Sequence, residues 1–324
     1  MNTIMKNWKA SLIMAAAVLA SSCDYGSGET DDSFVMLRLE CEGITKVTGV
    51  EKDDEDKVNS ITYYIFDEGG RLEASVNSSS SGSKAEVKVK NGQKDIYALV
   101  NCPDRSAPEN KKGFLESVSF LVDNLPDNLV MIGSTTTDIE KDMDVSVNVI
   151  HMTGKIVIKE VAVEFEAGAS DRIKIDSIYL INVNPSLSYG GEESSKPEDW
   201  FNKMRFSSST ADVLLSDQVD STIMNGCSYL HEHRFYAYPN STEADVHGGS
   251  TFTPRFTRLV ISTDMGFYSI NLPGIKSNTA FIINKVTISH PGSSNPDDQP
   301  DDGSFTVDLY IKDWTSGAEY TETI

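Results

Sequence analysis

The stretch Ala85-Glu-Val-Lys-Val-Lys90 alternates strictly between apolar and charged side chains. A period of two predicts a half-buried β-strand, with Val87 and Val89 facing the interior. Asn91-Gly92 follows as a tight-turn signal, and Asp95-Ile-Tyr-Ala-Leu-Val-Asn101 then has the composition of a second, more apolar strand. Two strands joined by a turn signal in so short a stretch indicate a β fold.

The same pattern recurs along the rest of the chain. Further strands are expected at residues 60–66, 145–149, 155–159, 174–182, 284–290 and 305–311. Helical signals are confined to Asn110–Leu121 and Lys196–Lys203, where Pro197 suits a first turn. Many short strands separated by turns are typical of β-sandwiches. We therefore expect an all-β fold of two β-sandwich domains, an N-terminal one at 33–152 and a C-terminal one at 153–324.

The N-terminus has the three parts of a secretory signal. Lys6 and Lys9 give a positive start, Ala10–Ala20 is uncharged, and Ser21-Ser22 precede Cys23. The apolar run is shorter than the ~20 residues that span a bilayer. A cysteine at this place is what a bacterial lipoprotein signal requires, since its thiol receives the lipid. The alternative is an ordinary signal peptide with an incidental cysteine.

We therefore expect residues 1–22 to be a lipoprotein signal peptide and Cys23 to be lipidated, for example with palmitate. Ala20 stands where such signals usually carry leucine. Residues 23–32 are acidic and rich in Gly and Ser, which suits a tether between membrane and folded domain. In this interpretation the lipid on Cys23 is the membrane contact.

The chain is strongly acidic, with a formal net charge of −21. Removal of residues 1–22, which carry two lysines and no acid, changes it to −23. Such a surface repels nucleic acid, so no nucleic-acid partner is expected. Besides Cys23, the cysteines are Cys41, Cys102 and Cys227. A Cys41–Cys102 disulfide is one interpretation, and buried free thiols in strands are the other.

Candidate catalytic and metal-binding residues are sparse. His231 and His233 would share one face of a strand, with Cys227 nearby, but no carboxylate cluster accompanies them as a third zinc ligand. His151 stands alone, and no Gly-x-Ser-x-Gly nucleophile motif is present. The aspartates Asp297-Asp298 and Asp301-Asp302 lack calcium-loop spacing and are expected to form a solvated acidic loop. We expect no enzyme activity, no metal and no cofactor.

The chain resembles the fimbrillins, the structural subunits of the type V pili of Bacteroides-type bacteria. The resemblance is carried by short pieces in order over most of the mature chain. They are Ile61-Thr-Tyr-Tyr-Ile-Phe-Asp-Glu-Gly-Gly70, residues 92–101, Met131-Ile-Gly133 followed by 145–161, Phe235-Tyr-Ala-Tyr-Pro-Asn240, Thr257-Arg-Leu-Val-Ile261, Gly292-Ser-Ser-Asn-Pro296 and 307–314. The family implies two transthyretin-like β-sandwiches, no catalysis and no cofactor.

The resemblance also implies an assembly mechanism. In the family, a protease cuts after a basic residue near the N-terminus, removes the first strand and leaves a groove for a neighbour's C-terminal strand. Here Ser33–Glu40 is the candidate for the removable strand. The family's Thr-Arg pattern falls at Thr45-Lys46, so processing is expected at Lys46, before an exposed acidic linker at Glu51–Asp56, or else at Arg38. A subunit that stays uncut would keep its lipid and act as the anchor.

The expected donor strand is the C-terminal segment. Its candidate residues are Phe305, Val307, Leu309, Ile311, Trp314 and Tyr320, although 305–311 also fits the last strand of its own sandwich. The implied protein is a shaft subunit of a cell-surface pilus, with other pilus subunits, copies of itself and accessory ones, as partners. It is placed in the fimbrium and outer membrane and supports adhesion and biofilm formation. The alternatives are an anchor subunit, or a surface lipoprotein that binds glycan or host protein through aromatic residues such as Trp200 and Phe201.

Overall fold

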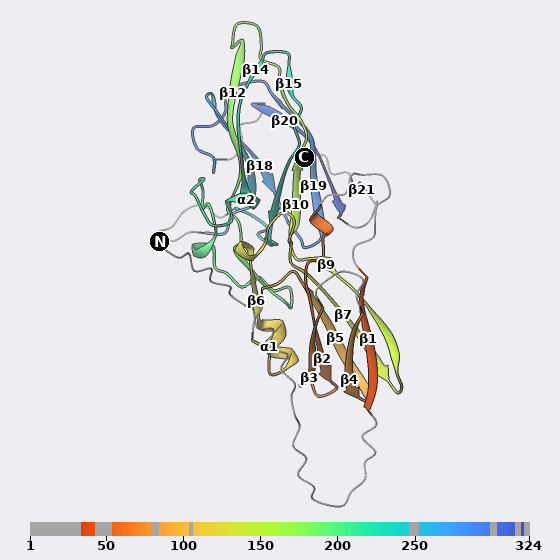
Figure 1. Cartoon of the computed structure of the whole chain (residues 1–324). Helices are drawn as coiled ribbons and strands as arrows, with labels where there is room; N and C mark the ends of the chain where they lie inside the picture. The colour runs from red at the N-terminus through yellow and green to blue at the C-terminus, as the bar shows by residue number, and fades with distance from the viewer. Residues whose placement is uncertain are drawn as a thin grey trace, which may run out of the picture. The chain divides into compact units, whose positions relative to one another are not determined.

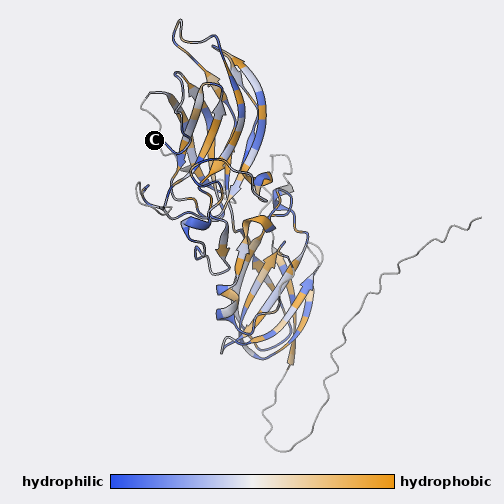
Figure 2. Cartoon of the chain, turned by 90° about the vertical axis from the view of Figure 1, so that its left-hand side faces the viewer, coloured by the Kyte–Doolittle hydropathy of each residue, from blue (hydrophilic) through white to orange (hydrophobic). Residues whose placement is uncertain are grey.

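Strands are the main regular structure of the described residues, as the alternating sequence predicts (Figure 1). The computed structural model describes residues 34–42, 54–78, 84–103, 106–245, 253–298, 303–314 and 319–320. Along many strands, hydrophobic and hydrophilic residues alternate, which gives each sheet one face for a core (Figure 2). The expected all-β fold with packed sheets is confirmed.

Two sheets are built from the N-terminal half. The first has the order β4 (Ala85–Lys90), β1 (Phe34–Glu42), β8 (Met143–Asn148). The second has the order β3 (Leu72–Ser78), β2 (Ile61–Asp67), β5 (Gly92–Val100), β7 (Met131–Ile139), β9 (Ile150–His151). Their inward side chains form one shared core, which includes Leu37, Leu39, Tyr63, Ile96 and Val147. A core shared by two sheets makes this part a sandwich.

The C-terminal half forms two further sheets. One has the order β14 (Ser216–Met224), β12 (Arg172–Ile181), β17 (Thr257–Thr263), β18 (Gly266–Leu272). The other has the order β15 (Ser228–Tyr229), β11 (Val161–Val163), β19 (Thr279–Ile288), β10 (Gly154–Ile158), β16 (His233–Ala237). On it, β20 (Phe305–Asp313) pairs with β19, and β21 (Glu319–Tyr320) pairs with β20.

A small two-stranded sheet links the halves of the sequence. In it β6 (Val118–Phe120) pairs with β13 (Ser186–Ser188). The larger core cluster also draws on both halves, since Phe66 and Phe114 belong to it together with Phe235 and Phe281. Residues 33–324 form one compact unit, so the division into domains at 152/153 stays a prediction.

The helical segments are shorter than the sequence predicts. In place of a helix over 110–121, α1 spans Lys111–Glu116, and the Asn110 side chain caps it by accepting a hydrogen bond from the Gly113 N–H at 2.8 Å. In place of a helix over 196–203, only the 3₁₀ turn η3 (Pro197–Asp199) forms. It stops because the chain becomes extended at Trp200, whose side chain is buried. The other short elements are α2 (Asp212–Leu215), η1 (Asp54–Asp56) and η2 (Leu121–Asp123).

The Asn91-Gly92 turn connects two strands that do not pair with each other. It does not close a hairpin, because β4 pairs with β1 while β5 pairs with β2 and β7. Gly92 has a φ of 109°, a conformation that glycine adopts without strain. The turn therefore carries the chain from one sheet of the sandwich to the other.

Candidate subunit-assembly site

Strand β1 lies in the middle of its sheet. It pairs antiparallel with β4, with Arg38 opposite Glu86, and parallel with β8, with Arg38 opposite Asp144. Its inward side chains alternate with its outward ones, and all four are buried: Val35, Leu37, Leu39 and Cys41. The expectation of an alternating strand at this place is confirmed.

The outward face of β1 carries an ordered row of charges. The Arg38 guanidinium lies 3.6 Å from the Glu86 carboxylate and 3.5 Å from that of Asp144. The Lys84 ammonium lies 3.4 Å from Asp144 and 3.8 Å from Glu40. Hydrogen bonding from Lys84, followed by that from Arg38, holds the pKa of Asp144 below its ordinary value. Opposite charges thus face each other across both edges of β1.

The two predicted processing residues have different settings. Arg38 lies within β1, where the strand is paired on both sides. A protease binds an extended, unpaired segment, so this peptide bond is protected while β1 is in place. Lys46 lies outside the described residues, as do residues 1–32 with the predicted lipidation site Cys23.

After the gap that follows β1, the next described element is η1, Asp54–Asp56. The prediction of an exposed linker at Glu51–Asp56 is wrong for Glu55, which lies in this element. This side chain is buried and lies 2.5 Å from the Lys155 ammonium. The hydroxyl of Tyr236 also donates a hydrogen bond to it, and the Arg234 guanidinium lies 3.5 Å away. Burial of a carboxylate is tolerated here because three cationic or donor groups surround it.

Asp56, the next residue, contacts the buried ring of His151 at 3.2 Å. The indole of Trp314 stacks on the same ring, with centroids 3.9 Å apart. The Trp314 backbone N–H donates to the Asn278 carbonyl at 2.9 Å. We call Glu55, Asp56, His151, Lys155 and Trp314 the junction cluster. It fixes the residues after the predicted processing region against the end of β20.

The predicted donor residues lie mostly within the C-terminal sheet. Strand β20 pairs with β19 over its whole length, from Phe305 opposite Ile288 to Asp313 opposite Thr279. Its core-facing residues are Phe305, Val307, Leu309 and Ile311, and they pack on the large core cluster together with Trp314. Tyr320 is part of β21, where it lies opposite Ile311.

The remaining sequence motifs are explained by structural contacts. His233 contacts the Tyr229 hydroxyl at 3.0 Å and the Asp217 carboxylate at 2.8 Å, while His231 is exposed. Across the described residues, no group of three or more potential metal ligands occurs. Trp200 is buried rather than exposed, and Phe201 packs on the core. Cys41, Cys102 and Cys227 are free thiols.

The prediction of a solvated loop at Asp297-Asp298 is wrong for Asp297. This buried carboxylate lies 2.7 Å from the Arg258 guanidinium and 3.0 Å from that of Arg255. Arg258 is itself fully buried and also bonds to Asp245. The acidic residue therefore anchors its loop to β17, while Asp298 is exposed.

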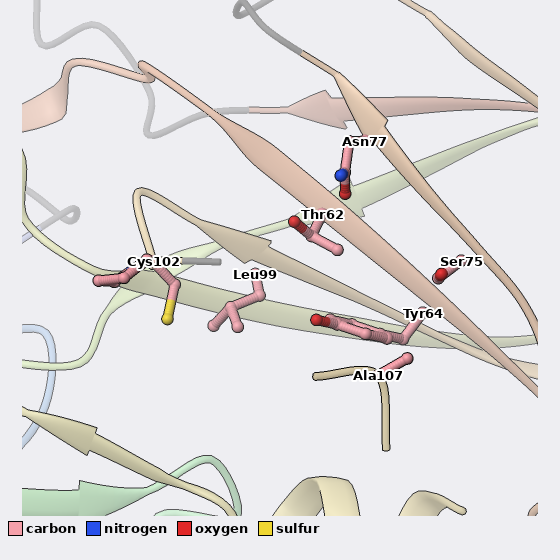
Figure 3. A pocket seen from close by; sticks show the side chains of 8 residues that line it. Thr62, Tyr64, Ser75, Asn77, Leu99, Cys102 and Ala107 are labelled. Atoms are coloured by element: carbon pink, nitrogen blue, oxygen red, sulfur yellow. The ribbon is translucent and has the colours of Figure 1, made fainter. Parts of the chain in front are cut away.

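One hollow beside the sheet β3-β2-β5 is too small for a metabolite (Figure 3). Its volume is about 90 Å³, and it is lined by Thr62, Tyr64, Ser75, Asn77, Leu99, Cys102, Pro103 and Ala107. Ligand sites usually enclose about 300–1,000 Å³. Cys102 in its wall contacts the Tyr189 hydroxyl at 3.1 Å. This hollow therefore falls below the usual size of a ligand site. Among the described segments, no helix is long and apolar enough to cross a membrane.

Comparison with known proteins identifies the family that this geometry resembles. Residues 44–175 match the family model of the major fimbrial subunit protein, FimA. The resemblance to the fimbrillins is confirmed. No curated protein matches the sequence. The matched family is one of structural fimbrial subunits, not of enzymes, and its place is the fimbrium at the cell surface.

Solved structures share the fold at low sequence identity. A candidate cell adhesion protein of Bacteroides eggerthii DSM 20697 aligns with a TM-score of 0.63 at 16% identity, covering 86% of this chain and 96% of that one. A fimbrilin (FimA) of Porphyromonas gingivalis W83 aligns with a TM-score of 0.61 at 12% identity, covering 87% and 98%. The tip fimbrial protein Mfa3 of Porphyromonas gingivalis, with a C-terminal truncation, gives 0.54 at 16% identity, covering 87% and 100%. These likenesses concern the fold.

Proposed function

We propose that this chain is a fimbrial subunit that is exported as a lipoprotein and assembled by strand exchange at the position of β1. The observation that supports this proposal is the position of β1 between β4 and β8. It is the first described strand, it is paired on both edges, and it directly precedes the predicted processing region. In the assembled fimbrium at the outer membrane the subunit serves adhesion and biofilm formation, with other pilus subunits as partners.

Removal of β1 would create a strong demand for a replacement strand. Leu37 and Leu39 are fully buried, and burying one such side chain contributes about 1.5–3 kcal/mol. The facing edges of β4 and β8 would also lose their backbone partners, and open edges of this kind recruit new strands. A neighbour's strand with alternating apolar residues would restore both contributions.

Cleavage after Lys46 fits this role better than cleavage after Arg38. A cut after Arg38 would have to occur inside a paired strand and would leave Leu39 and Cys41 in the groove. Filament-derived protein should therefore begin at Val47 in N-terminal sequencing. A start at Cys23 would show that β1 is retained, and would favour the anchor role.

Lipidation of Cys23 is the proposed route to the outer membrane. A single acyl chain binds membranes only marginally, so several chains on this cysteine are needed for stable anchoring. The Cys23→Ser precursor should remain unprocessed and should not incorporate a palmitate analogue. Normal labelling of that variant contradicts the assignment.

The C-terminal segment after Trp314 is the proposed donor. Residues 305–313 are paired with β19 in their own subunit, whereas β21 is attached through two residue pairs, Ile311–Tyr320 and Lys312–Glu319. Deletion of Glu319–Ile324 should leave a folded, exported monomer that no longer forms SDS-resistant ladders. Ladders that persist in this deletion rule out the C-terminal donor.

A further inference from the structure

The groove that β1 fills has two carboxylates at its centre. Glu86 on β4 and Asp144 on β8 lie on opposite sides of Arg38, which contacts both. Asp144 has a second cation in Lys84, so Glu86 is the carboxylate that depends more on Arg38. A basic residue at the position of Arg38 therefore favours a strand that replaces β1, because opposite charges across strands stabilise a pair and like charges destabilise it.

The interior of the groove requires apolar side chains without interruption. The four inward residues of β1 are buried in one hydrophobic core cluster, and the two central ones, Leu37 and Leu39, are fully buried. An ionised carboxylate at either central position would lose its hydration without gaining a cation. The groove therefore favours a strand that has four apolar residues at alternate positions, facing inward. On the outward face, the middle residue of that strand should be a cation.

The C-terminal tail of this chain does not meet these requirements. Residues 315–324 read Thr-Ser-Gly-Ala-Glu-Tyr-Thr-Glu-Thr-Ile and contain no lysine or arginine, so no register supplies the central cation. In an extended strand, Ala318, Tyr320, Glu322 and Ile324 would share one face. The other face would carry Glu319, Thr321 and Thr323, without any large apolar residue. The first face is the only candidate for the interior, and it includes a carboxylate.

No register of residues 315–324 meets both requirements. When Ala318–Ile324 fills the positions from Val35 to Cys41, Thr321 lies at the position of Arg38 and Glu322 at that of Leu37 or Leu39, for either strand direction. A two-residue shift toward the start of the tail moves Glu319 between Glu86 and Asp144.

A four-residue shift toward the start of the tail keeps both glutamates out of the interior. It places Ser316 and Ala318 at the two central positions, and Gly317 rather than a cation between Glu86 and Asp144. A two-residue shift toward the end of the tail leaves Glu322 at a central position, and a shift by one residue turns the polar face inward. The tail and the groove of one and the same chain are therefore mismatched in charge and in burial.

We propose that the groove of β1 accepts a strand from a different subunit, with alternating apolar residues and a lysine or arginine between Glu86 and Asp144. The proposal rests on the proposed function and adds the kind of partner. The tail of this chain is then left to fill the groove of another kind of subunit. Assembly would proceed through unlike neighbours rather than through copies of this chain.

Exchange of synthetic strands tests the proposal. Full-length protein is cut after Lys46, which leaves β1 in place without a covalent link, and labelled ten-residue peptides compete with it in mild urea. Residues 33–42 serve as the basic, alternating strand, and residues 315–324 as the tail. The tail peptide should bind at least about ten-fold more weakly, since an apolar side chain of this size contributes ten-fold or more when buried.

Two substitutions should convert the tail into a suitable strand. Glu322→Leu should raise the affinity of the tail peptide about ten-fold or more. Thr321→Lys, added to it, should give a further two- to five-fold at low salt, and high salt should remove that gain. Glu319→Leu is the matched control, since it removes a carboxylate from the outward face and should not raise the affinity.

The acceptor provides a second control for charge. Glu86→Lys in the cut protein should weaken the peptide of residues 33–42 and cancel the gain from Thr321→Lys. An unchanged tail that binds as tightly as the converted one would overturn the unlike-partner proposal while leaving strand exchange intact. Failure of every peptide to enter, including residues 33–42, would overturn both this proposal and the function on which it rests.

Cross-linking in filaments identifies the natural occupant. A photoreactive residue in place of Glu86 should capture a peptide of another polypeptide, and mass spectrometry should find a lysine or arginine flanked by apolar residues at the captured position. Capture of residues 315–324 of this chain would overturn the proposal. Capture of a foreign strand without a basic residue there would overturn it as well.

Discussion

The indole of Trp314 stacks on the imidazole of His151, with ring centroids 3.9 Å apart and an interplanar angle of 20°. Trp314 directly follows β20 and His151 belongs to β9, so the stack holds together parts of the chain that are far apart in sequence. The Lys155 ammonium also lies 5.1 Å from the Trp314 ring centre. Before β21, Trp314 is thus the last described residue, and these side-chain contacts hold it in place.

Replacing Trp314 should loosen the C-terminal segment. We expect Trp314→Ala to reduce the free energy of unfolding by about 2 kcal/mol, since the ring is partly buried and loses its stacking and cation contacts. Trp314→Phe keeps an aromatic ring and should lose about half as much. Urea unfolding measures both, and limited proteolysis should remove residues after 314 faster in the alanine variant. Equal stability of the two variants would contradict a specific role for the stack.

Neighbouring aspartates should respond very differently to truncation. Asp297→Ala leaves the buried Arg255 and Arg258 without their shared carboxylate, and should cost about 3–5 kcal/mol of folding free energy. Asp298→Ala removes an exposed carboxylate that accepts hydrogen bonds from Ser293 and Asn295, and should cost less than about 1 kcal/mol. Thermal unfolding of the two variants side by side checks this difference. Similar melting temperatures would mean that the buried ion pairs do not stabilise the loop.

A methyl group at Gly133 has no room. A Cβ there would lie 1.9 Å from the carbonyl oxygen of Asn148, which is backbone and cannot rotate away. Gly133→Ala should therefore displace β7 from β8 and lower the folding free energy by about 3 kcal/mol or more. Gly113→Ala in α1 meets only the Asn110 side chain, at 3.6 Å, and should stabilise by up to about 1 kcal/mol. If chemical denaturation showed Gly133→Ala to be more stable than Gly113→Ala, the close contact between Gly133 and the Asn148 carbonyl would be refuted.

Asp95 should make stability depend on acid pH. Burial opposes its ionisation, but hydrogen bonds from Lys111 at 2.7 Å and Thr136 at 2.5 Å outweigh this and lower its pKa below the ordinary value. A depressed pKa contributes stability above the unfolded-state value, and this stability is lost as the pH falls through the folded-state value. Asp95→Asn should thus cost about 1 kcal/mol at pH 7, and the cost should fade as the pH falls below the ordinary aspartate pKa of about 4 and through the lowered folded-state pKa.

Lys111→Met is the control for that titration. It removes the hydrogen bond that lowers the Asp95 pKa, so it should reduce the acid-dependent loss of stability while leaving the strand in place. Unfolding free energies measured from about pH 3 to pH 7 for the three proteins give the comparison. A constant difference between Asp95→Asn and the unchanged protein across this range would exclude the assigned shift.

The sequence allows the strands to be predicted but not their partners. Alternation at residues 33–40 and 85–90 reports one buried face per strand, and β1 and β4 have that face. Alternation does not report which strand lies alongside. The Asn91-Gly92 signal predicts a turn but not that the chain changes sheets there, since turn chemistry is local and pairing is not.

The burial of charged side chains is the main feature that the sequence does not allow to be predicted. Glu55 lies in an acidic run that is typical of an exposed linker, yet it is buried against Lys155 and Tyr236, 100 and 181 residues later. Asp297 is likewise buried against Arg258, although its sequence suggests a solvated loop. Such pairs leave no period in the sequence. Their only local signal is a basic residue inside an apolar strand, such as Arg258 in Thr257-Arg-Leu-Val-Ile261.

The parallel pairing of β1 with β8 has a consequence for the order of folding. Residues that meet there, such as Arg38 and Asp144, are separated by 106 positions. During synthesis β1 emerges first, and β4 can join it early, but its second edge stays open until β8 has been made. Contacts across so long a stretch form slowly. The first strand consequently keeps one open edge until most of the N-terminal half has been made, and its enclosure on both sides is one of the later steps of folding.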